Sequence, residues 1–210
     1  INGLRITDAA TIDVVEMVLS GVTNKSIVSA IANSGAKSVG ISGKDGNLIT
    51  AKRLIKVDEN SDSNVEKAID LGYVGEPEKI DPQVIHALIN EKMIPVIAPV
   101  GIGADGLTYN INADTAAGSI SAAMKASRMI MLTDVAGVLD QNGKLIPELT
   151  ISEAQELIKN KIVVGGMIPK IKTCIDAVLG GAEASVIMDG RMSHSLLLEL
   201  FTEHGVGTII

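Results

Sequence analysis

The sequence predicts an α/β protein with an open, mainly parallel sheet sandwiched by helices in an αβα three-layer arrangement. Strands that are covered on both faces form nearly continuous apolar runs. Helical patterns lie between the runs found here, and strands that alternate with helices favour a parallel sheet. The four runs are Ser38–Ser42, Ile94–Val100, Met129–Thr133 and Ser185–Met188.

The helices between the strands are predicted from capping residues at their starts and from glycines or other breaks after their ends. In chain order they begin at Thr7, Asn24, Asp81, Asn112, Ser152, about Ile168 and about Ser195. Their expected ends are near Ser20, Gly35, Lys92, Met124, Lys159, Leu179 and Phe201. Gly21 in particular is expected to separate the first two helices.

The stretch Ala51–Ile80 breaks the alternation of strands and helices. It is polar and extended over Thr50–Val57 and again over Gly72–Val74, with Asp58–Asn64 between them as a surface loop. We therefore expect a β-hairpin excursion at this place, and not a linker between domains.

The composition restricts the core and the partners. Hydrophobic residues make up 46% of the 210 residues and aromatic residues only 1%, so the core is predicted to be aliphatic. The net charge of −7 argues against a nucleic-acid or anionic-membrane partner, since both need a basic patch. No uninterrupted apolar run approaches the ~18 residues of a membrane span. Cys174 is the only cysteine, which fits a reducing compartment such as the cytoplasm.

Ligands of open α/β sheets bind beyond the carboxyl ends of the strands. Each apolar run leads there into small or polar residues, which marks one edge of the sheet as the expected active side. The segments that follow the runs are Ser42–Asn47, Val100–Gly103, Thr133–Gly137 and Asp189–Arg191.

The segment Gly101–Gly106 matches the pattern GxGxxG after a strand, but we interpret it as a hairpin turn. A dinucleotide site needs its third glycine inside a helix. Here Asp105-Gly106 is a turn signal, and the next residues are extended.

Two asparagines alternate along an extended segment, Asn110 and Asn112, and Asp114 follows in the first turn of a helix. An asparagine can both donate and accept hydrogen bonds, which suits a substrate with amide and carboxylate groups. Helix capping and the helix dipole would by themselves explain Asn112 and Asp114. They would not explain Asn110.

Lys170 follows a Gly165-Gly166 turn at the start of a helix, where the helix dipole disfavours a cation. A phosphoryl group bound there would remove the conflict; the alternative is a solvated surface lysine. The loop Thr133–Asp140 suits either a nucleotide base and ribose or a tight crossover. Arg5 either clamps a carboxylate or lies on the surface.

Several other kinds of site are not expected. The sequence has no Walker A pattern and no GxSxG nucleophile elbow. His86, His194 and His204 lack the spacing of metal ligands, so no metal site made by protein residues alone is predicted. Cys174 lies among apolar residues of a helix and is predicted to pack in the core.

Together these segments resemble the N-acetylglutamate kinase family, which has the amino-acid kinase fold. Aspartate, uridylate, carbamate and glutamate 5-kinases share this fold and some loops, but not GLRITD together with NINAD. The segments that carry the resemblance are Gly3–Asp8, Ser42–Ile49, Ala98–Gly118, Leu132–Asp140, Gly165–Lys170 and Asp189–Thr208.

The resemblance implies direct phosphoryl transfer from ATP, accompanied by Mg²⁺, to the side-chain carboxylate of N-acetyl-L-glutamate, in arginine biosynthesis. It implies that Arg5 binds a substrate carboxylate, that Asn110 contacts the substrate with Asn112 nearby, and that Asp114 orients lysines. Lys170 would stabilise the transferred phosphoryl group. The implied nucleotide-binding residues are Asp134, Val135, Gly137, Val138, Leu139, Gly166 and Met167, within the wider segments Asp134–Leu139 and Ile162–Met167.

The family also has an upstream strand with a catalytic lysine and two glycine-rich loops, which this sequence does not contain. We therefore expect a single kinase domain that is incomplete at its N-terminus, with an acetylglutamate-side lobe over about 1–125 and a nucleotide-side lobe over about 126–210. The alternatives are a non-catalytic binding remnant of the fold and a kinase of the same fold for another acceptor.

The end of the chain resembles the arginine-inhibited members of the family. This implies an arginine effector near Glu203 and Gly207. Those members form rings of six and the fold usually dimerises, so a homodimer or a hexamer is expected. A PII-type protein is a candidate regulator.

Overall fold

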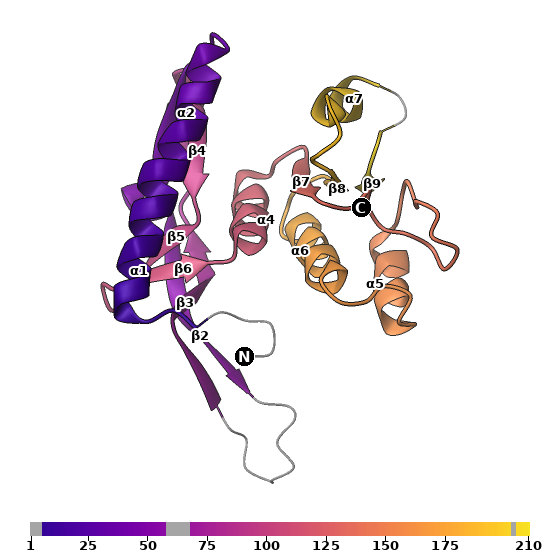
Figure 1. Ribbon diagram of the computed structural model, residues 1–210, viewed down its shortest axis with the longest axis horizontal. Helices are drawn as coiled ribbons and strands as arrows, with labels where there is room; N and C mark the ends of the chain where they lie inside the picture. Colours follow the sequence, from indigo (N-terminus) through magenta and orange to yellow (C-terminus); the bar gives the residue numbers. More distant parts are fainter. Residues whose placement is uncertain (1–5, 58–67, 203–204) are drawn as a thin grey trace. The chain divides into compact units, whose positions relative to one another are not determined.

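The computed structural model describes residues 6–57, 68–202 and 205–210 (Figure 1). The chain divides into two compact units, Ile1–Ala116 and Ala117–Ile210. The division falls within helix α4 (Ala113–Met124).

The first unit contains a parallel strand pair and a closed barrel. Strands β1 and β4 pair in parallel, with Ser38 opposite Ile94, and the barrel has the order β2-β3-β6-β5. The elements are α1 (Ala9–Glu16), the π-helical segment η1 (Met17–Thr23), α2 (Asn24–Asn33), β1 (Ser38–Ser42), the 3-10 turn η2 (Asp45–Asn47), β2 (Ile49–Val57), β3 (Ala68–Ile80), α3 (Gln83–Asn90), β4 (Ile94–Ala98), β5 (Val100–Gly103) and β6 (Thr108–Ile111).

The second unit is built on the sheet β7-β8-β9, in which β7 and β8 are parallel and β9 is antiparallel to β8. Its elements after α4 are β7 (Met129–Thr133), α5 (Ile151–Lys159), α6 (Met167–Leu179), β8 (Ser185–Asp189), α7 (Ser195–Phe201) and β9 (Thr208–Ile209). Apolar side chains of β7, β8 and α6 form its core, and Cys174 is fully buried among them. The predictions of an aliphatic core and of a packed cysteine are confirmed.

The α/β class is confirmed, as are the hairpin excursion and the turn after β5. Strands β2 and β3 pair antiparallel, and the whole of the loop predicted at 58–64 lies, like residues 65–67, outside the described residues. In the β5–β6 hairpin, Gly106 N–H donates to the carbonyl of Gly103 at 2.9 Å. The closing of β2, β3, β6 and β5 into a barrel was not predicted, because it depends on pairings between distant segments.

The predicted helix break at Gly21 is wrong. Residues Ala9–Asn33 form one helical stretch, which continues through Gly21 in the π-helical segment η1 (Figure 1). Gly21 does not adopt the positive φ with which a glycine ends a helix. Asn24 does not cap a helix either: its buried side chain donates from Nδ2 to the carbonyls of Ile41 (3.1 Å) and Val96 (2.8 Å).

Two other predicted caps are displaced by one or two residues. Asp8, and not Thr7, caps α1 by accepting from the backbone N–H of Thr11 at 2.7 Å. Thr150, and not Ser152, caps α5 in a reciprocal capping box with Glu153. In both cases the neighbouring residue has the better-placed oxygen, because the cap must accept from an N–H two or three positions further on.

By length and composition alone, the helical stretch Ala9–Asn33 is apolar enough to cross a membrane. The stretch is nevertheless tied to strands of its own unit. Besides the contacts of Asn24, Lys25 Nζ donates to the carbonyl of Gly40 at 2.8 Å. Helix α2 packs on β1 and β4, and Figure 1 shows it beside β4.

Candidate active site

Strand β6 places Asn110 in the first unit. The strand is held on both sides: Asn110 lies opposite Val100 of β5 and opposite Val74 of β3. Tyr109 and Ile111 are buried, whereas Thr108 and Asn110 lie on the other face and are half-buried. Within residues 6–57, 68–202 and 205–210, the Asn110 side chain makes no hydrogen bond. Its amide is therefore available to a ligand.

Asn112 and Asp114 lie where β6 passes into α4. The Asn112 Oδ1 atom accepts from the backbone N–H of Thr115 at 3.1 Å, which makes Asn112 the cap of α4. Asp114 is half-buried in the first turn of the helix. The capping interpretation of Asn112 is thus what the structure shows, and it leaves the Nδ2 group of Asn112 facing outward on an exposed residue.

Arg5 and Glu203 lie outside the described residues. The chain that directly follows Arg5 is fixed, however, because Thr7 is buried and bridges to β3. Its N–H donates to the carbonyl of Leu71 at 3.0 Å, and its carbonyl accepts from Tyr73 at 2.8 Å. Gly72 between them has φ +73°, and a Cβ there would lie 2.1 Å from the carbonyl oxygen of Thr7. Only glycine fits this close approach.

In the second unit an apolar pocket of ≈ 210 Å³ lies between the loop after β7 and the segment that leads into α6. Its lining comes from both segments that the family resemblance implies for the nucleotide, Asp134–Leu139 and Ile162–Met167. The lining residues are Val135, Gly137, Leu139, Ile162, Val163, Val164 and Met167. An apolar cleft with few polar groups is typical of a site for a flat heterocyclic base.

One hydroxyl makes two hydrogen bonds that help to hold the loop after β7. Thr208 Oγ1 accepts from the Val138 N–H at 2.8 Å and donates to the carbonyl of Ile146 at 2.7 Å. Gly137 has φ +148°, and a Cβ there would lie 2.6 Å from the same oxygen. Val138 is fully buried in the core and does not line this pocket, so its place among the nucleotide-binding residues stays a prediction. Asp134 is exposed on this loop and also lies outside the lining.

Lys170 lies in the first turn and a half of α6, the helix whose first residue, Met167, lines the pocket. Gly166 is the N-cap residue, and Gly165 before it has φ +59°. Nothing lies within 4 Å of a Cβ placed on either glycine. The two glycines are therefore open on the side where a side chain would lie, and the start of a helix favours an anion.

An ion pair at the carboxyl end of β8 was not among the predicted site residues. Asp189 accepts from Arg191 Nε at 2.9 Å and from its terminal nitrogen at 2.8 Å. These bonds hold the pKa of Asp189 down at about 2. The N–H of Gly190 donates to the carbonyl of Thr133 at 2.9 Å, which ties the pair to the end of β7. The Asp189-Gly-Arg191 segment after the last apolar run was the signal for this pair.

Among the described residues, no group of three or more histidine, cysteine, aspartate or glutamate side chains could hold a metal ion. A base-sized apolar pocket and a lysine on the helix beside it fit a nucleotide-dependent phosphotransferase.

The model of the amino acid kinase family matches residues 2–189, and the chain belongs to this family. It is 60% identical over 210 residues to an acetylglutamate kinase of Gluconobacter oxydans and 57% identical to that of Acidiphilium cryptum. All of this chain is covered in both comparisons, against 71% and 70% of the two relatives.

Among solved structures, N-acetylglutamate synthase of Neisseria gonorrhoeae, complexed with coenzyme A and N-acetyl-glutamate, matches with a TM-score of 0.85 and 27% identity. The match covers 100% of this chain and 46% of the synthase. A complex of the same synthase with coenzyme A and L-arginine matches with a TM-score of 0.82 and 26% identity, over 47% of the synthase chain.

Replacing Arg191 by methionine is expected to raise the pKa of Asp189 from about 2 toward 3.8, because hydrogen bonds from Arg191 are the largest cause of the low value. Since the pKa is lower in the folded state, the pair stabilises the fold above about pH 4, and this contribution is lost as the pH falls toward 2. A carbon-13 NMR titration of the carboxyl groups measures the shift. Asp140, whose pKa is lowered by backbone N–H groups of Lys144 and Asn142, should be unaffected. An unchanged Asp189 titration in the variant would show that Arg191 is not the cause.

Proposed function

We propose that this protein transfers the γ-phosphoryl group of ATP to the side-chain carboxylate of N-acetyl-L-glutamate, which gives N-acetylglutamyl phosphate in the second step of arginine biosynthesis. The observation that carries the proposal is the 60% identity with an acetylglutamate kinase over the whole of this chain. The available amide of Asn110 and the apolar pocket before α6 support it.

On the acceptor side, Arg5 forms a two-point pair with a carboxylate of the substrate. Asn110 offers a donor and an acceptor to the acetamido and carboxylate groups from a strand that is held on both sides. Asn112 contributes its Nδ2 donor, since its Oδ1 is used in the cap of α4. The resemblance to the family gives Asp114 the role of orienting the catalytic lysines.

On the nucleotide side, the adenine ring packs in the pocket lined by Val135, Gly137, Leu139 and Met167. Asp134 at the loop's exposed end accepts from the ribose hydroxyls. Gly166 and the start of α6 face the phosphates, with open space where a side chain of Gly166 would lie. Mg²⁺ bound together with ATP would neutralise charge on the phosphates.

The chemical step is an in-line displacement. An oxygen of the substrate carboxylate forms a bond to the γ-phosphorus while the bond from that phosphorus to the β,γ-bridging oxygen breaks, and ADP leaves with the electron pair. The attacking carboxylate is already ionised, so no general base is needed. Lys170 stabilises the charge on the transferred group, so that positioning and electrostatics supply the rate enhancement.

An arginine effector fits a second pocket, of ≈ 160 Å³, in the second unit. Its lining includes Arg128, Glu199, Thr202 and Gly207. Glu199 is 7% exposed, accepts from the N–H of Val206 at 2.9 Å and lies 3.5 Å from Arg128. A buried carboxylate of this kind would attract a guanidinium group. The Neisseria synthase, solved with L-arginine, gives further support. A PII-type regulator and a cytoplasmic location remain proposals from the resemblance alone.

A homodimer, on its own or within a hexamer, is the proposed assembly, formed through the helical stretch Ala9–Asn33. This stretch of 25 residues is about 37 Å long at 1.5 Å per residue. It exposes a row of apolar side chains, and a second copy in antiparallel orientation would cover that row with the same row of its own. The row consists of Val14, Met17, Val18, Val22 and Ile27.

The proposed reaction is tested by ADP release with N-acetyl-L-glutamate beside glutamate, aspartate, UMP and carbamate. Selective turnover of N-acetyl-L-glutamate is expected, with a loss of kcat on the order of 100-fold or more in Lys170→Met. Lys172→Met, an exposed lysine of the same helix, is the control and should keep its rate. Selective turnover of another acceptor would make the protein a different kinase of this fold. A folded protein without turnover would be a binding remnant. Added arginine should lower the rate, and an unchanged rate would remove the effector.

The adenine site is tested by Val164→Trp. Val164 lines the pocket and is 66% exposed, so the larger side chain can fill the pocket without disturbing the core. We expect the KM for ATP to rise about tenfold or more, the equivalent of ~1.4 kcal/mol, with little change in the KM for the acceptor. Leu179→Trp, at a residue of the same unit that is 67% exposed, is the matched control. Equal effects of the two substitutions would place the base elsewhere.

The proposed interface is tested by Val22→Glu, at a residue that is 71% exposed in the apolar row. Two carboxylates buried against each other across a two-fold axis should dissociate the dimer. Sedimentation velocity measures the species present. The control Ile55→Glu adds the same charge at a residue of β2 that is 61% exposed and should leave the assembly intact. A Val22→Glu protein that sediments like the unmodified one would exclude this helix face as the interface.

A further inference from the structure

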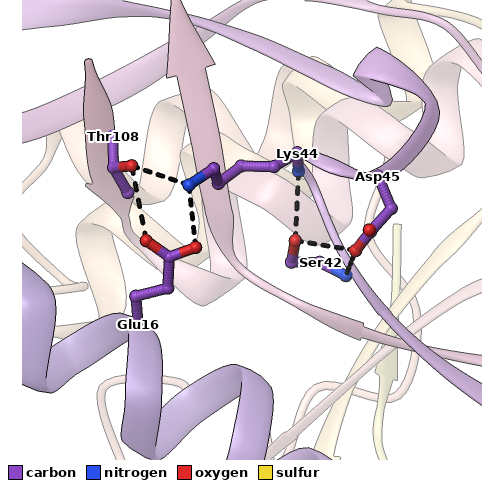
Figure 2. Close-up of polar contacts among 5 residues, drawn as sticks. All are labelled: Glu16, Ser42, Lys44, Asp45 and Thr108. Carbon is purple, nitrogen blue, oxygen red and sulfur yellow. Dashed lines mark hydrogen bonds and ion pairs between the residues drawn. The ribbon is translucent and has the colours of Figure 1, made fainter. Parts of the chain in front are cut away.

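Three segments that are far apart in the sequence meet at one lysine in the first unit (Figure 2). Lys44 follows β1, Glu16 is the last residue of α1, and Thr108 is the first residue of β6. Lys44 Nζ lies 2.8 Å from Glu16 Oε1 and donates to Thr108 Oγ1 at 2.9 Å. Thr108 Oγ1 donates in turn to Glu16 Oε2 at 3.4 Å. The three polar groups thus form a closed ring.

The turn that carries Lys44 is itself fixed. The Asp45 carboxylate accepts from the N–H of Ser42 at 2.7 Å and from its hydroxyl at 2.9 Å, and Ser42 Oγ accepts from the Lys44 N–H at 3.3 Å (Figure 2). A Cβ at Gly43 would lie 2.5 Å from the carbonyl oxygen of Val100, so the backbone of the turn lies directly on β5. The lysine therefore extends from a rigid base.

The ring acts on the strand that carries Asn110. Side chains alternate along a strand, so Thr108 and Asn110 lie on the same face of β6, separated by about 6.8 Å. The helix α1 begins four residues after Arg5 and ends at Glu16. Through the ring, Lys44 fixes the end of α1 to the first residue of β6, on the face of the strand where Asn110 presents its amide.

The stability of the fold alone does not account for the ring. Its lysine and glutamate side chains are 31% and 35% exposed, and ion pairs with such exposure contribute little to stability. Yet the ring uses every side-chain oxygen of Glu16 and of Thr108, and it brings together three segments that are far apart in the sequence. Such an arrangement fits a requirement for geometry more than a requirement for stability.

We propose that Lys44, held by Glu16 and Thr108, is a positioning residue for the acceptor: it fixes β6 against α1 and so sets the place of the Asn110 amide. This inference rests on the proposed function, in which Asn110 binds N-acetyl-L-glutamate.

The test is steady-state kinetics of Lys44→Met. The KM for N-acetyl-L-glutamate is expected to rise about tenfold, with the KM for ATP nearly unchanged, because the nucleotide pocket lies in the other unit. Lys44→Arg should restore most of the affinity, since arginine can reach the same two oxygens. Glu16→Gln should raise the same KM, and the double variant Glu16→Gln/Lys44→Met should be no worse than Lys44→Met alone.

The matched control is Lys52→Met, which removes another lysine of the same unit from an exposed ion pair, with Glu76 at 3.2 Å. Its kinetics should not change. An acceptor KM in Lys44→Met equal to that of the unmodified protein, or an equal rise in both KM values, overturns this inference while the proposed function stands. An unmodified protein that does not turn over N-acetyl-L-glutamate overturns both. If Lys44→Met fails to fold, Lys44→Arg and Glu16→Gln decide by the same two KM values.

Discussion

The side-chain amide of Asn24 joins the helical stretch of the first unit to both strands of its parallel pair. It donates to the carbonyls of Ile41 in β1 and Val96 in β4, and it is 3% exposed. Leaving such buried groups without partners costs about 1–3 kcal/mol. The contact also explains why residue 40 is glycine: a Cβ there would lie 1.7 Å from Asn24 Oδ1. The distance between the helix and the strands is therefore set by the side-chain amide of Asn24 and by the absence of a side chain at Gly40.

A second constraint acts on the same helical stretch, and the π-helical segment η1 lies between the two. Glu16, directly before η1, belongs to the polar ring with Lys44 and Thr108, whereas Asn24, directly after it, is bound to β1 and β4. A π-helical turn holds more residues than an α-helical one, so it rotates the residues that follow it. This rotation allows one continuous helix to meet the barrel at Glu16 and the parallel pair at Asn24. An α-helix interrupted at Gly21 would not impose both contacts on one rigid element.

Local patterns in the sequence predicted the strands well and the helix ends less well. The run Met129–Thr133 is a strand with the predicted bounds, because a buried parallel strand needs little beyond its own apolar residues. The error at Gly21 has a different origin. A glycine that follows a helical pattern usually ends the helix. Here the helix continues past Gly21, because Asn24 is hydrogen-bonded to residues that lie 17 and 72 positions away in the sequence. Contacts between residues so far apart cannot be predicted from a short stretch of sequence.

The same distinction applies to the candidate site. The segments that contribute to the site were predicted from the sequence, because ligand-binding loops lie at the carboxyl edge of a parallel sheet. Val135 and Met167 from two of these segments line one pocket. What the sequence could not indicate is how these loops are held. Val138 looked equivalent to its neighbours, yet its N–H is bound by Thr208, 70 residues away, which directs its side chain into the core. Lys44 was likewise part of a recognisable segment without an assigned role, because its role depends on Glu16 and Thr108. Ligand-facing residues can be predicted from their place after a strand, whereas the residues that position them depend on which distant partner the fold supplies.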